Sequence, residues 1–520
     1  MPSTFLSFAS LTPFILRTGL GLVLALAVLW APPAKADEPL RVGSKRFTES
    51  YILAQVLAQT AQTAQTAQTA QASGAAVEVK QGLGNTAIVF AALRAGSIDL
   101  YPDYTGTIAQ EILKDPQATS LPALRAGLAP LGLGVDVALG FNNGYALAMR
   151  DDVAARLNIT RLSDLAAHPT LKLGLSNEFI GRADGWPGVA RRYGLAQRPA
   201  GLDHGLAYDA LTAGQVDAID IYTTDAKIGH LKLRVLQDDL AHFPRYDAVV
   251  LYRLDVPQRF PAAWAAIQRL GGSINEPAMI ALNARAELDK VAFDAIAREH
   301  LAGSAPSAAG GGFWAKLWGP DLARLTVQHL TLVALSVGLA VLVGVPLAVW
   351  VAPHAAARAV VLGATGLLQT VPALALLAVL ISALGRIGML PALVALTLYA
   401  LLPIMRNTCT GLAEVPAGLK LAGTALGLTA RQRLRHIELP LAAPVMLAGV
   451  RTATTIAVGT ATIAAFIGAG GYGERIVTGL ALNDRGLMLA GALPSAALAL
   501  LCEAIFGALA WRLGQRGQSR

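Results

Sequence analysis

Cysteine and charge are both scarce in this chain. Among 520 residues there are two cysteines, Cys409 and Cys502, and 15% of the residues are charged while 54% are hydrophobic. Because no cysteine precedes Cys409, a disulfide-held core and a cysteine-linked lipid anchor are excluded for everything before it. So low a share of charged residues is not typical of an ordinary soluble protein.

Motifs for catalysis are also missing. No G-x-x-x-x-G-K-[ST] segment occurs, so the chain has no P-loop and cannot by itself hydrolyse ATP. The eight histidines lack the spacing of metal ligands, and no Ser-His-Asp or Cys-His set is apparent. We therefore expect no enzyme activity, and no metal or cofactor bound by this chain.

Patterning and tyrosine content divide the chain in two. Residues from about 40 to 300 mix polar and apolar positions, whereas residues from about 325 to 515 form long apolar runs. Nine of the eleven tyrosines lie between Tyr51 and Tyr252. This division predicts a soluble domain joined to a membrane domain. The net charge of +8 does not indicate nucleic acid, because much of the basic excess flanks apolar runs.

The N-terminal segment has the pattern of a secretory signal. Arg17 precedes the apolar run "GLGLVLALAVLW", and Ala34-Lys35-Ala36 supplies an A-x-A cleavage site. We predict a signal peptide over residues 1–36, with an uncleaved membrane anchor as the alternative. In both cases the domain that follows is exported.

Residues 37–300 alternate between strand-like and helix-like pieces. "LRVGS" is followed by "TESYILAQVLAQ", in which Thr48 suits a helix N-cap, and the alternation continues to about residue 253. Such alternation predicts an α/β fold with largely parallel sheets, arranged as two lobes with a ligand in the crevice between them. The repeat "AQTAQTAQTAQTAQ" from Ala58 is expected to extend the first helix into solvent.

A linker and a membrane domain are predicted next. Residues 301–324 combine the flexible run "LAGSAPSAAGGG" with "FWAKLWGP", whose aromatics suit either a helix at the membrane interface or ordinary packing. The membrane domain, residues 325–520, contains five apolar runs near the ~20 residues that a bilayer requires. They cover 325–351, 358–383, 387–405, 441–467 and 486–511.

Basic residues set the predicted orientation. They gather between the third and fourth runs and at the C-terminus, which places both segments in the cytoplasm by the positive-inside rule. Five crossings then place the domain before residue 325 outside. The predicted signal peptide leads independently to the same orientation.

The predicted cytoplasmic loop contains a spaced motif. Its spacing resembles that of the coupling loop of ABC importer permeases: nine residues separate Gly427 from Ile437, and one residue separates Ile437 from Leu439-Pro440. The usual Glu-Ala-Ala opening of that motif is degenerate here, since Leu421, Ala422 and Gly423 occupy it. The loop is expected to form a short helix, a glycine turn and a second basic helix that Pro440 stops. The candidate positions for coupling to an ATPase are Ala422, Gly423, Gly427, Ile437, Leu439 and Pro440.

Longer segments carry a more specific resemblance. "GLLQTVPALALLAVLI", "LYALLPIMRNTCTGL" and "ATIAAFIGAGGYGERIVTGL" resemble permeases of quaternary-amine (glycine betaine, carnitine, choline) ABC importers. "VGSKRFTESYILAQ", "SIDLYPDYTGT", "SNEFIGRADGWPGV" and "IDIYTTDAKI" resemble the substrate-binding proteins of the same importers. The resemblance implies a two-lobed periplasmic-binding-protein fold (type II-like), then an all-α permease of five core transmembrane helices.

The resemblance also implies a ligand site. A trimethylammonium group donates no hydrogen bond and is best held by the negative faces of aromatic rings, each contributing about 0.5–2 kcal/mol. In this family such a cage is built from tyrosines, and the matching positions here are Tyr104, Tyr145, Tyr222 and Tyr246. Tyr101 is a less certain neighbour that could instead belong to the core. The carboxylate of a betaine would be held at the positions matching Lys45, Thr107 and Arg182.

The expected function is therefore binding and translocation of a quaternary-ammonium osmoprotectant, with glycine betaine first and with choline, carnitine or another small cationic or zwitterionic solute as alternatives. A second possibility is a membrane sensor or ligand-gated channel built on the same binding domain. The importer would sit in the bacterial inner membrane as two copies of this chain with a separate ABC ATPase. Asp103, Asp220 and Asp225 are expected to cap loops and to close the lobes.

Overall fold

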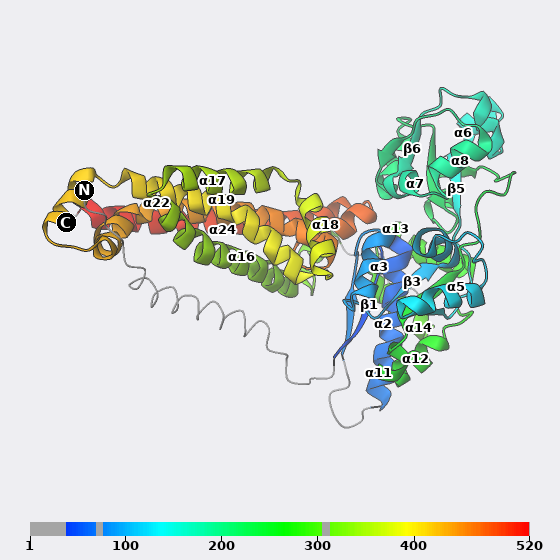
Figure 1. Cartoon of the computed structure of the whole chain (residues 1–520). Helices are drawn as coiled ribbons and strands as arrows, with labels where there is room; N and C mark the ends of the chain where they lie inside the picture. The colour runs from blue at the N-terminus through cyan, green and yellow to red at the C-terminus, as the bar shows by residue number, and fades with distance from the viewer. Residues whose placement is uncertain (1–37, 69–75, 304–311, 519–520) are drawn as a thin grey trace.

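The computed structural model describes residues 38–68, 76–303 and 312–518. The predicted signal peptide and part of the predicted linker lie outside these residues. The described chain forms a two-lobed α/β domain and an elongated helical bundle, with the α/β domain at one end of the bundle (Figure 1). The division expected from the patterning of the sequence is therefore confirmed.

The first lobe is built on a five-stranded sheet with the strand order β2-β1-β3-β10-β4. The first three of these strands are parallel, and β10 is antiparallel to both of its neighbours. The strands are β1 (Leu40–Gly43), β2 (Val77–Lys80), β3 (Leu100–Tyr104), β4 (Leu133–Asp136) and β10 (Ala248–Arg253).

The second lobe repeats this pattern with the order β7-β6-β8-β5-β9. Here β5 is the strand that runs antiparallel to both neighbours. The strands are β5 (Tyr145–Arg150), β6 (Leu173–Ser176), β7 (Ala200–Leu202), β8 (Ala218–Tyr222) and β9 (Leu233–Val235). Both sheets are mixed, but in each of them only one strand, β10 or β5, runs against the other four, so the prediction of largely parallel sheets is confirmed.

Two chain crossings explain the antiparallel strands. The chain leaves the first lobe after β4 and returns to it before β10, and Asn142 pairs with Asp247 where the two crossings run antiparallel. Each crossing continues directly into the middle of the sheet that it enters, as β5 or as β10. Because both crossings lie side by side, they form the hinge between the lobes.

Helices cover both lobes. In the first lobe α2 (Thr48–Gln68) packs against α12, α13 and α14. The repeat from Ala58 continues α2 as expected, although Ala61 is fully buried. The helices of this lobe are α2, α3 (Thr86–Arg94), α4 (Thr105–Thr107), η2 (Ile108–Leu113), α5 (Leu121–Leu128), η3 (Ala129–Leu131), α11 (Val256–Arg259), α12 (Pro261–Gln268), α13 (Glu276–Glu287) and α14 (Phe293–Ala302). The second lobe has α6 (Asp151–Leu157), η4 (Leu162–Ala167), α7 (Asn177–Gly181), α8 (Trp186–Tyr193), α9 (His204–Thr212) and α10 (Lys227–His230).

In the bundle, four described helices are long and apolar enough to cross a membrane. They are α16 (Leu322–Val351), α19 (Met389–Glu414), the continuous segment Ala430–Ile467, and α24 (Arg485–Gln518). The continuous segment contains α21 (Ala430–Arg433), η5 (Leu434–Glu438), α22 (Leu439–Ala461) and η6 (Thr462–Ile467). The short helices α15 (Phe313–Leu317), α20 (Ala417–Ala425) and α23 (Gly473–Ala481) complete this part.

The run expected at 358–383 does not form one straight helix. It folds as α17 (Ala355–Thr370) and α18 (Ala373–Leu384), which meet at an angle of 102°. Pro372 has no N–H to continue the first helix, and it drives the preceding Val371 to extended angles (φ −68°, ψ 126°). The carbonyl oxygen freed at Val371 accepts a hydrogen bond from the Tyr399 hydroxyl at 2.6 Å.

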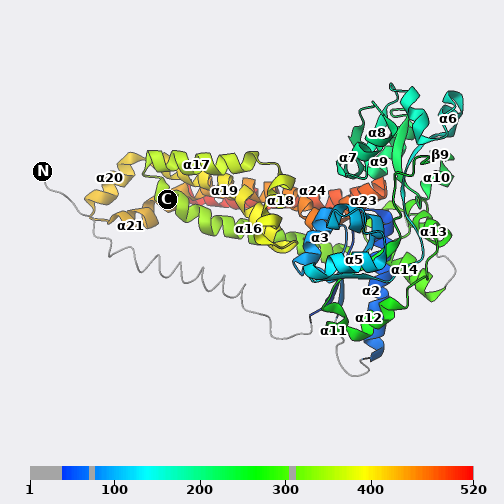
Figure 2. The same cartoon turned by 45° about the vertical axis from the view of Figure 1, so that its right-hand side comes forward.

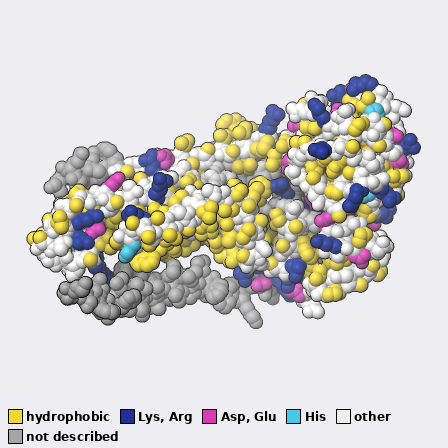
Figure 3. Space-filling model, turned by 45° about the horizontal axis from the view of Figure 1, so that its top comes forward, with side chains coloured by type: hydrophobic (Ala, Val, Ile, Leu, Met, Phe, Trp, Pro, Cys, Tyr) yellow, Lys and Arg dark blue, Asp and Glu magenta, His cyan; other side chains and the backbone are white. Residues whose placement is uncertain are grey.

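The bundle surface is apolar. Figure 3 shows hydrophobic side chains over the visible face of the bundle, with charged side chains gathered on the α/β domain and at the opposite end. Large exposed apolar residues occur on several helices, among them Val327, Trp350, Val360, Leu367 and Leu500. An apolar surface of this extent suits contact with lipid or with other membrane helices.

The motif loop forms the end of the bundle that is farthest from the α/β domain (Figure 2). It contains α20, a turn at Gly427 (φ +81°) and α21, whose N-cap Thr429 forms a capping box with Gln432. A Cβ on Gly423 would lie 2.7 Å from the Cδ1 atom of Ile437, so these two motif positions pack directly against each other.

Pro440 has a different role from the one expected. It does not stop the second short helix, because η5 leads without a break into α22, which begins at Leu439. Pro440 lies in the first turn of α22, where a residue without an N–H is tolerated. Pro440 therefore lies within the continuous helical segment Ala430–Ile467 and does not end it.

We predict that Gly423→Leu loosens this loop, because the larger side chain must displace Ile437. Tryptic cleavage at the exposed arginines of the loop should become several-fold faster in the purified protein. Gly418→Leu is the matched control, since it lies on the same helix α20 and a Cβ there would meet nothing within 4 Å. Equal cleavage of the two variants would show that the contact between Gly423 and Ile437 does not hold the loop.

Candidate functional site

The four predicted tyrosines come from separate elements that meet at the boundary between the lobes. Tyr104 ends β3, Tyr145 begins β5, and Tyr222 ends β8 directly opposite Tyr145 in the sheet. Tyr246 lies in the returning chain crossing, just before β10. The ring of Tyr145 lies 5.1 Å from that of Tyr222 and 5.5 Å, edge to face, from that of Tyr246. All four rings line one small cavity of about 20 Å³.

Phe47 completes the aromatic cluster, although it was not predicted. Its ring lies 5.4 Å from that of Tyr222 and 6.2 Å from that of Tyr104, so it bridges the second lobe to the first. The signal available in the sequence was its place in the matched segment "VGSKRFTESYILAQ", two residues after Lys45. Tyr101, the less certain neighbour, is fully buried in the core of the first lobe and does not line the cavity.

The residues predicted to bind a carboxylate already have acidic partners. Lys45 Nζ lies 2.6 Å from Asp103 Oδ1, with both side chains almost fully buried. Arg182 makes two hydrogen bonds to Asp184, of 2.8 and 2.5 Å, and its guanidinium lies 5.3 Å from the centre of the Tyr145 ring. Lys45 lines the small cavity with the tyrosines, whereas Arg182 lies behind Tyr145.

Thr107 lines the same cavity and lies in the tight turn that follows β3. This turn requires a glycine, because a Cβ on Gly106 would lie 2.6 Å from the ring of Tyr246. Because the backbone at Gly106 lies so close to the Tyr246 ring, the "YTGT" segment of the first lobe contacts the cage. Thr107 itself is 3% exposed.

A buried carboxylate, Glu49, was missed by the sequence analysis. It lies in the first turn of α2 and accepts four hydrogen bonds, two of them from the hydroxyls of Tyr104 and Thr224 at 2.5 Å each. The amides of Asn143 and Asn283 donate the other two, at 3.0 and 3.2 Å. Thr224 follows β8 in the second lobe, so this carboxylate joins the lobes. No spacing in the sequence links these five residues, which come from five different segments.

The environment of Glu49 changes its protonation. Burial raises the pKa of this carboxyl to about 7, and the four hydrogen bonds only partly offset the effect. A positive charge in the neighbouring cage would favour the ionised form. The charge of Glu49 is therefore expected to change near neutral pH.

The aspartates expected to cap loops and close the lobes act within single lobes. Asp103 binds Lys45, and Asp220 accepts hydrogen bonds from the backbone and hydroxyl of Ser176. Asp225 accepts from the backbone N–H of Tyr222 and caps the loop that follows β8. Contacts between the lobes include those of Glu49 with Thr224 and of Thr86 with Glu178, the latter at 3.1 Å.

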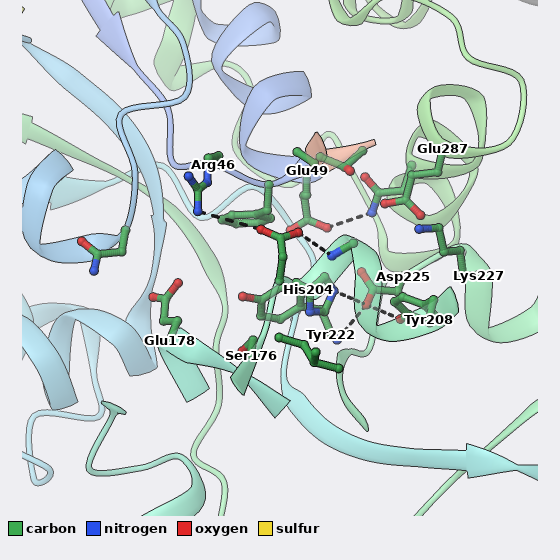
Figure 4. Close-up of a pocket in the computed structure, with 18 of the residues that line it drawn as sticks. Arg46, Glu49, Ser176, Glu178, His204, Tyr208, Tyr222, Asp225, Lys227 and Glu287 are labelled. Carbon is green, nitrogen blue, oxygen red and sulfur yellow. Dashed lines mark hydrogen bonds and ion pairs between the residues drawn. The ribbon is translucent and has the colours of Figure 1, made fainter. Parts of the chain in front are cut away.

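A larger cavity of about 230 Å³ adjoins the cage. It shares Phe47, Asn143, Glu178 and Tyr222 with the small cavity. Next to Tyr222, His204 Nε2 and the Tyr208 hydroxyl contact Asp225 at 3.0 and 2.6 Å (Figure 4). Burial alone would lower the pKa of His204, but the Asp225 carboxylate outweighs it and raises this pKa to about 9. Within the described residues, no group of His, Cys, Asp and Glu is placed to hold a metal ion.

Two family models match the chain. Residues 38–303, more than half of the sequence, match the "Substrate binding domain of ABC-type glycine betaine transport system". Residues 341–515 match the "Binding-protein-dependent transport system inner membrane component". The two matches correspond to the α/β domain and to the helical bundle.

Curated relatives fall into the same two groups. An osmoprotectant import permease protein, OsmW, of Salmonella typhimurium is 46% identical over 35% of this chain and 86% of its own length. A glycine-betaine-binding protein of Pseudomonas aeruginosa is 35% identical over 56% of this chain and 97% of its own length. An ergothioneine transport permease/ergothioneine binding protein, EgtU, of Helicobacter pylori is 31% identical, and the chain spans 50% of its length.

A solved structure titled as a glycine betaine/carnitine/choline ABC transporter covers 51% of this chain and 98% of its own, with 26% identity and a TM-score of 0.42. The family assignment rests on the two family models and on the curated relatives. The permease match assigns this chain to transport and not to catalysis, with ATP hydrolysis left to a separate ATPase of the importer. The chain therefore belongs to the family of substrate-binding domains of ABC-type glycine betaine transport systems, joined in one polypeptide to a binding-protein-dependent permease.

Proposed function

We propose that this protein binds a quaternary-ammonium osmoprotectant outside the membrane and passes it through its own permease domain. The observation that carries the proposal is the aromatic cluster at the lobe boundary, in which Phe47 and four tyrosines surround one cavity. Aromatic faces attract a methylated cation, and exclusion of water strengthens that attraction. Tyr104, Tyr145, Tyr222 and Tyr246 form the proposed cage.

Glycine betaine is the proposed main substrate. Lys45, Thr107 and Arg182 would hold its carboxylate, Arg182 through a fork suited to two oxygens. A second candidate, choline, is favoured by the acidic partners, because Asp103 and Asp184 already neutralise Lys45 and Arg182. Carnitine and ergothioneine also carry a trimethylammonium group and are further alternatives.

The proposed location is the bacterial inner membrane, with the binding domain on the periplasmic side after a signal peptide of residues 1–36. Two observations support this orientation. The basic motif loop and the α/β domain lie at opposite ends of the bundle (Figure 2). Basic loops are enriched on the cytoplasmic side of membrane proteins.

The proposed assembly contains two copies of the chain and an ABC ATPase. The loop around Gly427 would dock on the ATPase, since it presents the exposed apolar side chains of Leu421 and Leu426 beside arginines. A bundle with this much apolar surface offers room for a second copy. The domain boundaries that we propose are 37–300 for binding, 301–324 for the linker and 325–520 for the permease.

We predict that Tyr222→Ala weakens binding of glycine betaine to the purified protein about two- to thirtyfold, because one aromatic face is worth about 0.5–2 kcal/mol. Calorimetric titration measures the effect. Tyr222→Phe is the control, since it keeps the ring and removes the hydroxyl, and should bind nearly as well as the wild type. An equal loss of affinity in both variants would mean that the Tyr222 hydroxyl, and not its ring, binds glycine betaine.

Affinity should also depend on pH through Glu49. A cation in the cage favours the ionised carboxylate, so binding below pH 7 must release a proton and affinity should fall as the pH drops from about 7 to 5. Above pH 8 Glu49 is already ionised and should contribute no further change in affinity. Titrations of choline across this range measure the dependence, and Glu49→Gln should remove it. A pH-independent wild type would contradict the link between Glu49 and the cage.

Uptake tests the function as a whole. Cells that lack other betaine uptake should accumulate labelled glycine betaine when they express this chain with its ATPase, and should lose that uptake when the ATPase is omitted. Lys45→Met should lower betaine uptake several-fold more than choline uptake if Lys45 binds the carboxylate. Absence of uptake for both solutes would refute the proposed substrate class.

A further inference from the structure

One segment of the permease reaches into the main hydrophobic core of the binding domain. This segment, Leu480–Asp484, connects the end of α23 to α24. Leu482 is 5% exposed and belongs to the main hydrophobic core of the binding domain, with Ala481 packed against the same core. At its far end Asp484 forms an ion pair with Lys316 of α15.

The segment is held by both lobes. Asn483 Nδ2 donates to Asp209 Oδ2 at 2.6 Å, and Asp209 lies on α9 of the second lobe. Lys290 Nζ, which follows α13 in the first lobe, donates to the carbonyl oxygen of Leu482 at 2.8 Å. A Cβ on Gly205 would lie 3.0 Å from the carbonyl oxygens of Leu480 and Ala481, so α9 approaches the segment closely. The permease segment is therefore fixed relative to both lobes at once.

The segment also forms a wall of the larger cavity. Ala481 lines this cavity of about 230 Å³ together with residues of both lobes. The cage cavity, at about 20 Å³, has space for about one water molecule. Drug-sized ligands occupy pockets of about 300–1,000 Å³, so the larger cavity suits a solute somewhat smaller than these.

The lining of the larger cavity suits a methylated cation. Five carboxylates line it, opposed by three basic side chains, and Phe47, Tyr208 and Tyr222 supply aromatic surface. The carboxylates are Glu49, Glu178, Asp203, Asp225 and Glu287, and the basic residues are Arg46, Lys227 and His204.

Two buried amides of the lining have unused acceptors. Asn143 and Asn283 are 4% and 2% exposed, and the Oδ1 atom of each accepts no hydrogen bond from the described residues. A buried polar atom without a partner is costly unless a ligand or water satisfies it. Only water or a solute with a hydrogen-bond donor, such as the hydroxyl of choline, would satisfy these acceptors, because a trimethylammonium group donates no hydrogen bond.

We propose that this cavity is a second binding site for the quaternary-ammonium substrate, completed by Ala481 of the permease and used between the cage and the membrane. Glu49 connects the two sites, since its carboxylate binds the Tyr104 hydroxyl of the cage and also lines the larger cavity. A cation leaving the cage thus moves past Tyr222 without losing its aromatic and acidic surroundings. This inference rests on the proposed function and adds a weaker, separate site to it.

Saturation binding of labelled choline to the purified full-length protein tests the proposal. The wild type should bind two molecules per chain, one tightly and one more weakly. Ala481→Phe fills the larger cavity and should abolish only the weaker site. Glu287→Gln, which changes charge and not size, should weaken that site at least threefold. Tyr145→Ala, whose ring lines the cage and not the larger cavity, should weaken the tight site at least threefold and leave the other unchanged.

Ala126→Phe on the exposed face of α5 adds the same ring elsewhere and should leave both sites intact. A single molecule bound per wild-type chain would refute the second site. Retention of the weaker site in both Ala481→Phe and Glu287→Gln would also refute it, because the site would then lie elsewhere. Absence of any tight binding would instead refute the proposed substrate class, so the two failures can be told apart.

Discussion

The arrangement of the binding domain depends on the buried carboxylate of Glu49. Four donors from both lobes and from the hinge converge on it, and so much buried polar surface is stable only when every partner is in place. One of these donors is the hydroxyl of Tyr104, a residue of the proposed cage. The same carboxylate therefore contacts a residue of the proposed cage and, through Thr224, the second lobe.

Fusion to the permease places one permease segment in direct contact with the binding domain. The segment around Leu482 enters the core of the binding domain and bonds to both lobes. Since the two partners are one polypeptide, their effective concentration is of the order of millimolar, as for modules joined by short flexible linkers. At the far end of the bundle, the contact between Gly423 and Ile437 keeps the motif loop compact.

Much of the architecture could be predicted because it follows from patterns of apolar and polar residues within short stretches of the sequence. The apolar runs indicated the membrane helices, and the alternation of strands and helices indicated an α/β domain. The predictions for Pro440 and for the run 358–383 failed, because each of these local patterns is compatible with two structures. Pro440 suits the start of a helix as well as a stop after one, and a run of the length of 358–383 can bend at Pro372. The antiparallel β5 and β10 depend on the chain crossings, which no short stretch of sequence records.

The sequence by itself determined the two-part organisation, the family resemblance and the tyrosine positions, because these lie in contiguous segments with a recognisable order. The tertiary structure alone decided which side chains meet. The roles of Glu49 and Phe47 became visible only when segments separated by up to 234 residues, as for Glu49 and Asn283, were brought together. It also showed that Lys45 and Arg182 already have acidic partners. Charged side chains pair when they are close in space, and the separation of 58 residues between Lys45 and Asp103 does not reveal that they are.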